Sequence, residues 1–489
     1  MRTSAFVSWP SAPLTRRLVL DALAKSQEQI DFVDTLGNCE YDRLIQWSTY
    51  DEIDHDLTNT HRGSVLASNY TFRKALIRKH YLSHSIHVYL TKFPRSILQM
   101  ASPLTYDVDM TFADELDEKW ADELYDLGQF LEDDPQRWWI LKPFVSFVHL
   151  YSAHINEISA SGMADRGMGI RLFNTKEALQ QIFEEFELSD SEDGDYEDET
   201  SGVSKTAVIT SRLRHFVIQE YILSPLLFDP NETPLDGKQV SPQPKLQGHK
   251  VSFAMFHLRA YCVASGALQL YLYDHILALF CSVPYRRPNS LASDGEEPYT
   301  MGLEAHLTNT SLQMARGEEG VRLFDELVGC QILGEDGEAL GLFTGDSRKN
   351  IIHQMTEVLS ETFRAALQTP VHFQPLENAF ELYGVDFLVE HTPSTASFQV
   401  KILEINAEPA IELTGPRLTW ILEGLFDSIA NVCVEPFIKR KHVSEIHGIW
   451  GVQEVLYDLI WGTLSINIAV YNAKTLATGP MTFYCDTAE

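Results

Sequence analysis

Two apolar runs in the last third of the sequence contain acidic side chains that could bind a metal ion. Asp386 lies within FELYGVDFLV, and Glu404 and Asn406 lie within FQVKILEINAEP. Strand alternation places these polar side chains on one face of each run. Isolated carboxylates are costly to bury, whereas two carboxylates and an amide oxygen suit a Mg²⁺ ion that also binds nucleotide phosphates. The pattern predicts a magnesium site, and an edge strand with exposed acids is the alternative.

Basic side chains elsewhere could bind the phosphates of such a nucleotide. Lys74 lies in RKALIRK, Lys142 closes WWILKP, and Arg166 lies in the glycine-rich segment GMADRGMGI at 162–170. Cations and backbone amides together bind phosphate, and glycines allow the backbone to approach closely. A plain turn and solvated lysines are the alternative interpretation of the same residues.

Two further segments carry polar groups in apolar surroundings. His306, Thr308 and Asn309 lie close together in AHLTN, and Arg259 interrupts the apolar run FHLRAYCVA. An arginine in such a run needs an anionic partner or a wet cleft. The alternatives are a loop with a helix N-cap for AHLTN and a structural ion pair for Arg259.

Predicted strands and helices alternate along the chain and would position these residues. Periodicity and composition predict helices at 73–82 and 176–188, the second with Asn174 as N-cap. Strands are predicted at 138–141, 215–222, 267–273, 380–389 and 398–405. The run SDSEDGDYEDET at 189–200 is too charged to pack, which predicts a disordered surface loop.

Composition excludes several classes of protein. The 489 residues contain 38 Lys and Arg against 69 Asp and Glu, and the net charge of −31 disfavours direct nucleic-acid binding. The six cysteines form no CxxC pair, which argues against a zinc site or a disulfide framework. The N-terminus lacks an apolar signal region, and the apolar stretch 455–470 is too short to cross a bilayer. We expect a cytoplasmic protein without a membrane segment.

Taken together and in this order, the motifs from about Ser68 to Phe437 resemble the tubulin-tyrosine ligase family. The resemblance extends in particular to the ligase-like domain of P-body-associated proteins. The positions that match family motifs residue for residue are Lys74, Lys142, Gln219, Arg259, His306, Thr308, Asn309, Asp386, Glu404 and Asn406.

The resemblance implies an α/β (α+β) ATP-grasp fold. Such a fold has several mixed and antiparallel sheets with flanking helices, and it binds the nucleotide between its central and C-terminal lobes. We expect an N-terminal lobe at 1–125, a central lobe at 126–245, a C-terminal lobe at 246–440 and an atypical tail at 441–489. The central lobe would include the acidic loop 189–205 and an aromatic insertion at 144–161. We hypothesise that this insertion and the tail are sequence retained or read through in the gene model from which the protein sequence was translated.

The resemblance also implies the cofactors ATP and Mg²⁺ and a role for each matched residue. Lys74 and Lys142 would hold the phosphates, and Asp386, Glu404 and Asn406 would bind Mg²⁺. The glycine-rich lid would contribute Arg166, Gly167 and Ile170, and the adenine slot would be lined by Gln219, Glu220, Tyr221 and Ile222. Arg259 would neutralise the acceptor carboxylate, with His306, Thr308 and Asn309 beside the reacting groups.

The implied reaction is carboxylate–amine ligation through an acyl phosphate. ATP phosphorylates a carboxylate, and an amine then displaces the phosphate, which joins an amino acid donor to a polypeptide acceptor such as a tubulin tail or another protein. The alternative is a nucleotide-binding or inactive scaffold in a cytoplasmic P-body assembly with mRNA-decapping proteins.

Four positions depart from the family pattern. The lysine of the family's hinge is Glu220 here, a lysine and an aspartate are replaced by Met255 and His257, and an arginine is replaced by Leu279. The lost positive charge predicts a weak grip on an anionic tubulin tail. The same loss of charge should affect the binding of ATP less.

Overall fold

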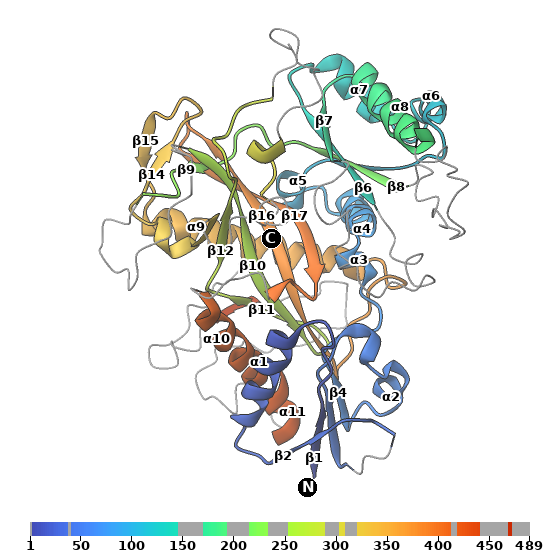
Figure 1. The fold of residues 1–489 in the computed structure, drawn as a ribbon, viewed down its shortest axis with the longest axis vertical. Coiled ribbons are helices and arrows are strands. Elements are labelled where there is room, and N and C mark those ends of the chain that lie inside the picture. The colour runs from blue at the N-terminus through green and yellow to red at the C-terminus, as the bar shows by residue number, and fades with distance from the viewer. Residues whose placement is uncertain are drawn as a thin grey trace, which may run out of the picture.

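The described strands form three sheets, and the N-terminal sheet lies at one end of the molecule (Figure 1). The computed structural model describes residues 2–37, 41–144, 170–192, 215–232, 253–288, 303–308, 320–411, 418–440 and 468–471. Among the helices of these segments, none combines the length and the apolar character that crossing a membrane requires.

The N-terminal sheet is parallel. Its strands, in spatial order, are β2 (Ile30–Val33), β1 (Thr3–Phe6), β3 (Arg43–Gln46) and β4 (Val65–Ala67). Parallel neighbours need a crossover, and helices α1 (Pro13–Ala24) and α2 (His55–Thr60) lie in two of the connections. Proline at the start of α1 is favourable because this position needs no backbone N–H.

The central sheet has ten strands, and the long strand β10 (Ala254–Ser265) pairs with β16 (Phe380–Thr392), which in turn pairs with β17 (Ser397–Ala407). Helix α9 (Gly345–Leu367) packs its apolar residues on this sheet, and its N-cap Thr344 accepts a hydrogen bond from the Ser347 amide at 3.1 Å. The remaining strands are β9 (Leu227–Phe228), β11 (Gln269–Tyr273), β12 (Leu277–Phe280), β13 (Val321–Leu323), β14 (Gln331–Leu333), β15 (Ala339–Leu342) and β18 (Ile468–Tyr471).

The third sheet is antiparallel, in the order β5 (Thr105–Asp109), β8 (His215–Glu220), β6 (Trp139–Phe144) and β7 (Arg171–Phe173). Helices α7 (Tyr125–Asp133) and α8 (Lys176–Glu192) cover it, and their apolar faces share one buried cluster with the sheet (Figure 1). The N-cap of α8 is Thr175, whose hydroxyl accepts from the Ala178 amide at 3.0 Å. Asn174 instead donates to the Pro135 carbonyl at 2.9 Å, so its predicted capping role is wrong.

Two other predicted elements also need correction. The single helix expected at 73–82 is wrong because the chain is extended at Arg78, which separates α3 (Lys74–Ile77) from α4 (Lys79–Lys92). The loop expected at 189–205 begins later, since α8 continues to Glu192. The rest of that loop and residues 145–161 of the insertion lie outside the described residues.

Sheet membership crosses two of the expected lobe bounds. Strand β5, from the expected N-terminal lobe, lies in the sheet of β6, β7 and β8, and β9, from the expected central lobe, joins the ten-stranded sheet. Within the expected tail, β18 pairs in parallel with β11, and the other residues beyond 440 lie outside the described part. The lobe bounds themselves stay a prediction.

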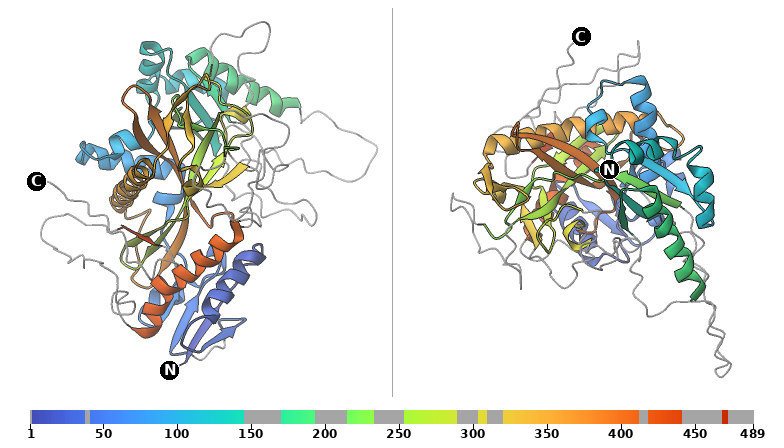
Figure 2. Two further views of the ribbon diagram at one scale, coloured as in Figure 1. Left: turned by 90° about the vertical axis from the view of Figure 1, so that its left-hand side faces the viewer. Right: turned by 90° about the horizontal axis from the view of Figure 1, so that it is seen from above.

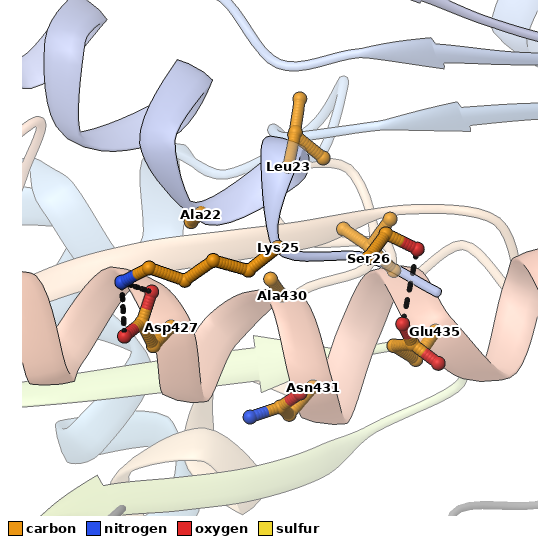
Figure 3. A pocket seen from close by; sticks show the side chains of 9 residues that line it. Ala22, Leu23, Lys25, Ser26, Asp427, Ala430, Asn431 and Glu435 are labelled. Carbon is orange, nitrogen blue, oxygen red and sulfur yellow. Dashed lines mark hydrogen bonds and ion pairs between the residues drawn. The ribbon is translucent and has the colours of Figure 1, made fainter. Parts of the chain in front are cut away.

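The helical segment that begins with α10 (Thr419–Ile429) packs between the N-terminal sheet and the ten-stranded sheet, in one shared apolar cluster. Helix α10 runs beside α1, as Figure 1 and the left-hand view of Figure 2 show. Around a small cavity between the two helices, the Lys25 ammonium pairs with Asp427 at 2.7 Å, and the Ser26 hydroxyl donates to Glu435 at 3.0 Å (Figure 3). In the part of the chain that the structure describes, no residue of the acidic strands β16 and β17 lines this cavity.

Candidate functional site

Strand pairing brings the three polar residues of β16 and β17 together. Asp386 and Glu404 are direct cross-strand partners, immediately before a β-bulge in the pairing. The Asn406 amide donates to Glu404 Oε1 at 3.0 Å and to Asp386 Oδ2 at 3.4 Å. One amide therefore bridges both carboxylates, which lie close enough together to share a cation.

Arg259 neutralises one of these carboxylates. It lies opposite Asp386 on β10 and makes a bidentate contact through Nε and Nη2, the latter at 2.9 Å. Burial alone would raise the pKa of Asp386, but the charges of Arg259 and His257 hold this pKa well below its usual range. The expected role of Arg259 was contact with an acceptor carboxylate, and in this structure its partner is Asp386. Gly384 allows this close packing, since a Cβ there would lie 2.8 Å from Pro409.

Lys79 and Lys142 face the second carboxylate. The Lys79 ammonium lies 2.7 Å from Glu404 Oε2. Burial alone would raise the pKa of Glu404, but the charge and hydrogen bond of Lys79, together with the Asn406 amide, lower it. Lys142, on β6, donates to the Gln219 side-chain oxygen on β8 at 2.7 Å. Burial, followed by the charge of Lys79, lowers the pKa of Lys142 to about 8. Both lysines and Gln219 line one cavity with Thr105.

Lys79 is the residue that motif reasoning missed. Lys74, the expected phosphate ligand, is exposed at the start of α3, whereas Lys79 begins α4 and reaches Glu404. Both lysines belong to RKALIRK, so the signal was present in the sequence. It was hidden because the helix break at Arg78 rotates the second half of the segment away from the first.

The residues expected to line the adenine slot lie in and around one apolar cluster. Tyr221 and Ile222 are buried there with Met255, and Ile170 packs against the cluster. Glu220, at the end of β8, turns away and forms an ion pair with Arg137. Of the four residues expected to line the adenine slot, Tyr221 and Ile222 therefore lie together, next to Ile170 of the expected lid. Gln219 instead contacts Lys142, and Glu220 contacts Arg137.

Of the AHLTN residues, His306 contacts Tyr221 in the apolar cluster, and Thr308 contacts His257 next to the acid pair. The Tyr221 hydroxyl shares a hydrogen bond with His306 Nδ1 at 2.8 Å, and burial lowers the pKa of His306 to about 4, so its imidazole is neutral at pH 7. The Thr308 hydroxyl contacts His257, which lies 3.5 Å from Asp386. Asn309, Arg166 and Gly167 lie outside the described residues.

The residues present fit a magnesium ion with bound phosphates. The described residues contain no group of three or more His, Cys, Asp or Glu placed to hold a metal by themselves. Mg²⁺ characteristically takes one or two carboxylates and completes its shell with water and phosphate oxygens, which matches Asp386, Glu404 and the Asn406 amide. Three cations, Arg259, Lys79 and Lys142, face two carboxylates. The surplus positive charge suits an anion.

The depressed pKa of Lys142 predicts that nucleotide binding takes up protons. A bound phosphate favours the ammonium form and raises its pKa, so affinity should fall as pH rises through 8, by at most about tenfold per pH unit. Calorimetry of ATP binding at pH 8 to 8.5, in buffers of different ionisation enthalpy, should detect uptake of part of a proton. Lys142→Gln should abolish the uptake, and the matched surface change Lys92→Gln should preserve it. Equal heats in all buffers for the unchanged protein would contradict this role.

Comparisons with known proteins show which family and fold the chain is similar to. The pattern of the "Tubulin-tyrosine ligase family" matches residues 59–442. The chain is 34% identical over 435 residues to the probable tubulin–tyrosine ligase PBY1 of Saccharomyces cerevisiae, covering 86% of this chain and 50% of that protein. It is 31% identical to a probable tubulin–tyrosine ligase of Schizosaccharomyces pombe, covering 86% of this chain and 89% of the relative. The chain thus spans about half the length of the first relative and most of the second.

A solved structure has the same fold. The C-terminal domain of Pby1 from K. lactis, described as an ATP-grasp enzyme interacting with the mRNA decapping enzyme Dcp2, matches with a TM-score of 0.57 and 29% identity. The match covers 89% of this chain and 94% of that domain. The predicted α/β ATP-grasp fold is confirmed.

Proposed function

Because the chain belongs to the tubulin-tyrosine ligase family, we propose that it is an ATP-dependent carboxylate–amine ligase that adds an amino acid to a protein. The observation that carries the proposal is the acid pair of Asp386 and Glu404, bridged by Asn406 and faced by Lys79 and Lys142. Two acids side by side, next to two lysines that line one cavity, suit a nucleotide with its metal better than they suit a structural core, because gathering this many charges is costly without a ligand.

Asp386, Glu404 and Asn406 would hold Mg²⁺, which when bound neutralises charge on the phosphates. Lys142 would donate a hydrogen bond to a phosphate oxygen from a position fixed by Gln219. Tyr221 and Ile222 would enclose the adenine, and neutral His306 would hold the Tyr221 hydroxyl in place. Asp386 and Tyr221 are buried, which strengthens electrostatic contacts at these two side chains.

The reaction would proceed in two displacements. A carboxylate oxygen attacks the γ-phosphorus of ATP, ADP leaves, and an acyl phosphate forms. The amine of the second substrate then attacks the acyl carbon, the C–O bond to phosphate breaks, and an amide and inorganic phosphate result. Cationic residues around the γ-phosphate would stabilise the charge that is shared during the first displacement.

A second candidate function is a nucleotide-binding scaffold in an mRNA-decapping assembly of cytoplasmic P-bodies. Two observations favour it: the Pby1 domain is described as interacting with Dcp2, and Asp386 is already neutralised by Arg259. Incubation with ATP, labelled amino acids and a cell extract separates the candidates. A ligase incorporates label into protein and releases phosphate, and Glu404→Gln stops both. A scaffold incorporates nothing, and its capture of decapping proteins is unchanged by Glu404→Gln.

We expect weak or no tyrosination of tubulin tails, because basic groups that would grip an acidic peptide are absent. Glu220→Lys should raise affinity for such a peptide, and the gain should shrink with salt, as exposed charge contacts do. Glu220→Gln is the matched control, since it also breaks the contact with Arg137. Met255 and Leu279 are only 4% and 9% exposed, so lysine or arginine there would be buried and is not a useful test. Efficient tyrosination of detyrosinated tubulin by the unchanged protein would show that the missing charges are dispensable.

A further inference from the structure

We propose that Lys79 exchanges partners when the nucleotide binds. It holds Glu404 while the acid pair lacks a metal ion, and it moves to the phosphates of ATP once Mg²⁺ occupies the pair. This inference rests on the proposed ATP-dependent function and adds a positioning residue to it. Before binding, Lys79 would act as a built-in competitor of the metal.

The contacts of Lys79 place it at the metal position. Its ammonium lies 2.7 Å from Glu404 Oε2, while the Asn406 amide contacts the other oxygen of the same carboxylate at 3.0 Å. A cation that coordinates Glu404 at Oε2 would have to displace the ammonium. Asp386 differs, because its bidentate contact with Arg259 lies within the sheet and is largely buried.

The position of Lys79 gives it a second partner within reach. It lines the same cavity as Lys142 and Gln219, and its charge helps to lower the pKa of Lys142. Two ammonium groups held this close repel each other unless an anion lies between them. Lys142 is hydrogen-bonded to a neutral amide, so a phosphate that enters the cavity would be attracted by both lysines.

The local backbone allows the side chain to move. Lys79 is the first residue of the 14-residue helix α4, directly after the extended residue Arg78, and its side chain is 40% exposed. The first helical hydrogen bond runs from the Leu82 amide to the Arg78 carbonyl. Lys79 therefore lies in the first turn, at the N-terminal end of the helix. Lysine side chains rotate readily when half-exposed, whereas the buried fork of Arg259 is fixed.

Two binding measurements test the exchange, and neither depends on turnover. In the first, Mn²⁺ binding to the nucleotide-free protein is followed by electron paramagnetic resonance, with Mn²⁺ replacing Mg²⁺ at hard oxygen ligands. In the second, a non-hydrolysable ATP analogue is titrated at saturating Mg²⁺. Lys79→Met should tighten Mn²⁺ binding roughly 2–5-fold, because the competing ion pair is gone. It should weaken the analogue roughly tenfold, because a charged contact to phosphate is lost.

Lys79→Arg keeps the charge and should leave Mn²⁺ affinity near that of the unchanged protein. Lys92→Met, at the opposite end of α4, is the matched control and should change neither value. Opposite shifts in Lys79→Met support the exchange, since a purely structural lysine would weaken both. Two unchanged values, or two weakened ones, overturn it. If the unchanged protein binds neither Mn²⁺ nor the analogue, the proposed function fails first and the inference falls with it.

Discussion

Glu404→Gln is expected to reduce magnesium-dependent ATP turnover by about 100-fold or more, because a direct ligand should matter at least as much as the outer groups around a metal. The substitution keeps the shape of the side chain and removes only the charge that balances the cation. Glu404 is partly exposed and pairs with the half-exposed Lys79, so the fold should tolerate the change. Turnover and Mg²⁺-dependent analogue binding are measured on the same preparation.

A matched control lies on the same pair of strands. Glu390 on β16 forms an ion pair with Lys401 on β17 at 3.4 Å, away from the candidate site, and Glu390→Gln removes an equal charge from another carboxylate–lysine pair. This variant should retain turnover. An equal loss in both variants would mean that the sheet, and not a metal site, is being disturbed. Unchanged turnover in folded Glu404→Gln would remove Glu404 from the site.

Arg73→Met is expected to lower the free energy of unfolding by about 3–5 kcal/mol, since it leaves a buried carboxylate without its cation. Arg73 forms an ion pair with Glu381, whose side chain is only 1% exposed. Glu381 also accepts hydrogen bonds from the Tyr383 hydroxyl at 2.8 Å and the Tyr70 amide at 3.2 Å. Chemical denaturation of the purified chain measures the change. The surface pair of Arg287 and Glu335 is the control, and Arg287→Met should cost less than about 1 kcal/mol.

The pH dependence gives this second prediction an independent check. Burial raises the pKa of Glu381, against the opposing charge of Arg73. A raised carboxyl pKa means that the folded state binds the proton more tightly than the unfolded state does. The cost of burying the ionised Glu381 is therefore absent at low pH, where the carboxyl is protonated, and grows as pH rises. Without Arg73 the pKa rises further. The difference between Arg73→Met and the unchanged protein should therefore shrink when stability is measured near pH 5 instead of pH 8, and an equal or larger difference at pH 5 would contradict it.

Local pattern predicted the strands of the site but not their partners. The predicted strands at 380–389 and 398–405 correspond to β16 and β17, because alternating apolar residues and a short connection favour an antiparallel pair. The sequence also indicated that Arg259 needs an anion. It could not identify Asp386, which lies 127 positions away and meets Arg259 only through the register of β10 and β16.

For Lys79, too, the sequence did not identify the partner. Its partner Glu404 lies on a distant strand, and the contact depends on the helix break at Arg78, which apolar periodicity did not indicate. Family motifs directed attention to Lys74 because motifs compare positions and not distances. Long-range pairs are set by tertiary packing, so a single sequence gives the residue types of a site more reliably than its contacts.

We propose that the acid pair and Lys142 form one site for ATP and its metal. A crystal structure with Mg²⁺ and a non-hydrolysable ATP analogue tests it most directly, for the full chain and for a chain lacking residues 144–161. We expect a metal ion bound by Asp386 and Glu404, and the terminal phosphates in contact with Lys142. Nucleotide bound elsewhere would contradict this site, and so would an acid pair that still contacts Lys79 and holds no metal at saturating Mg²⁺ and analogue.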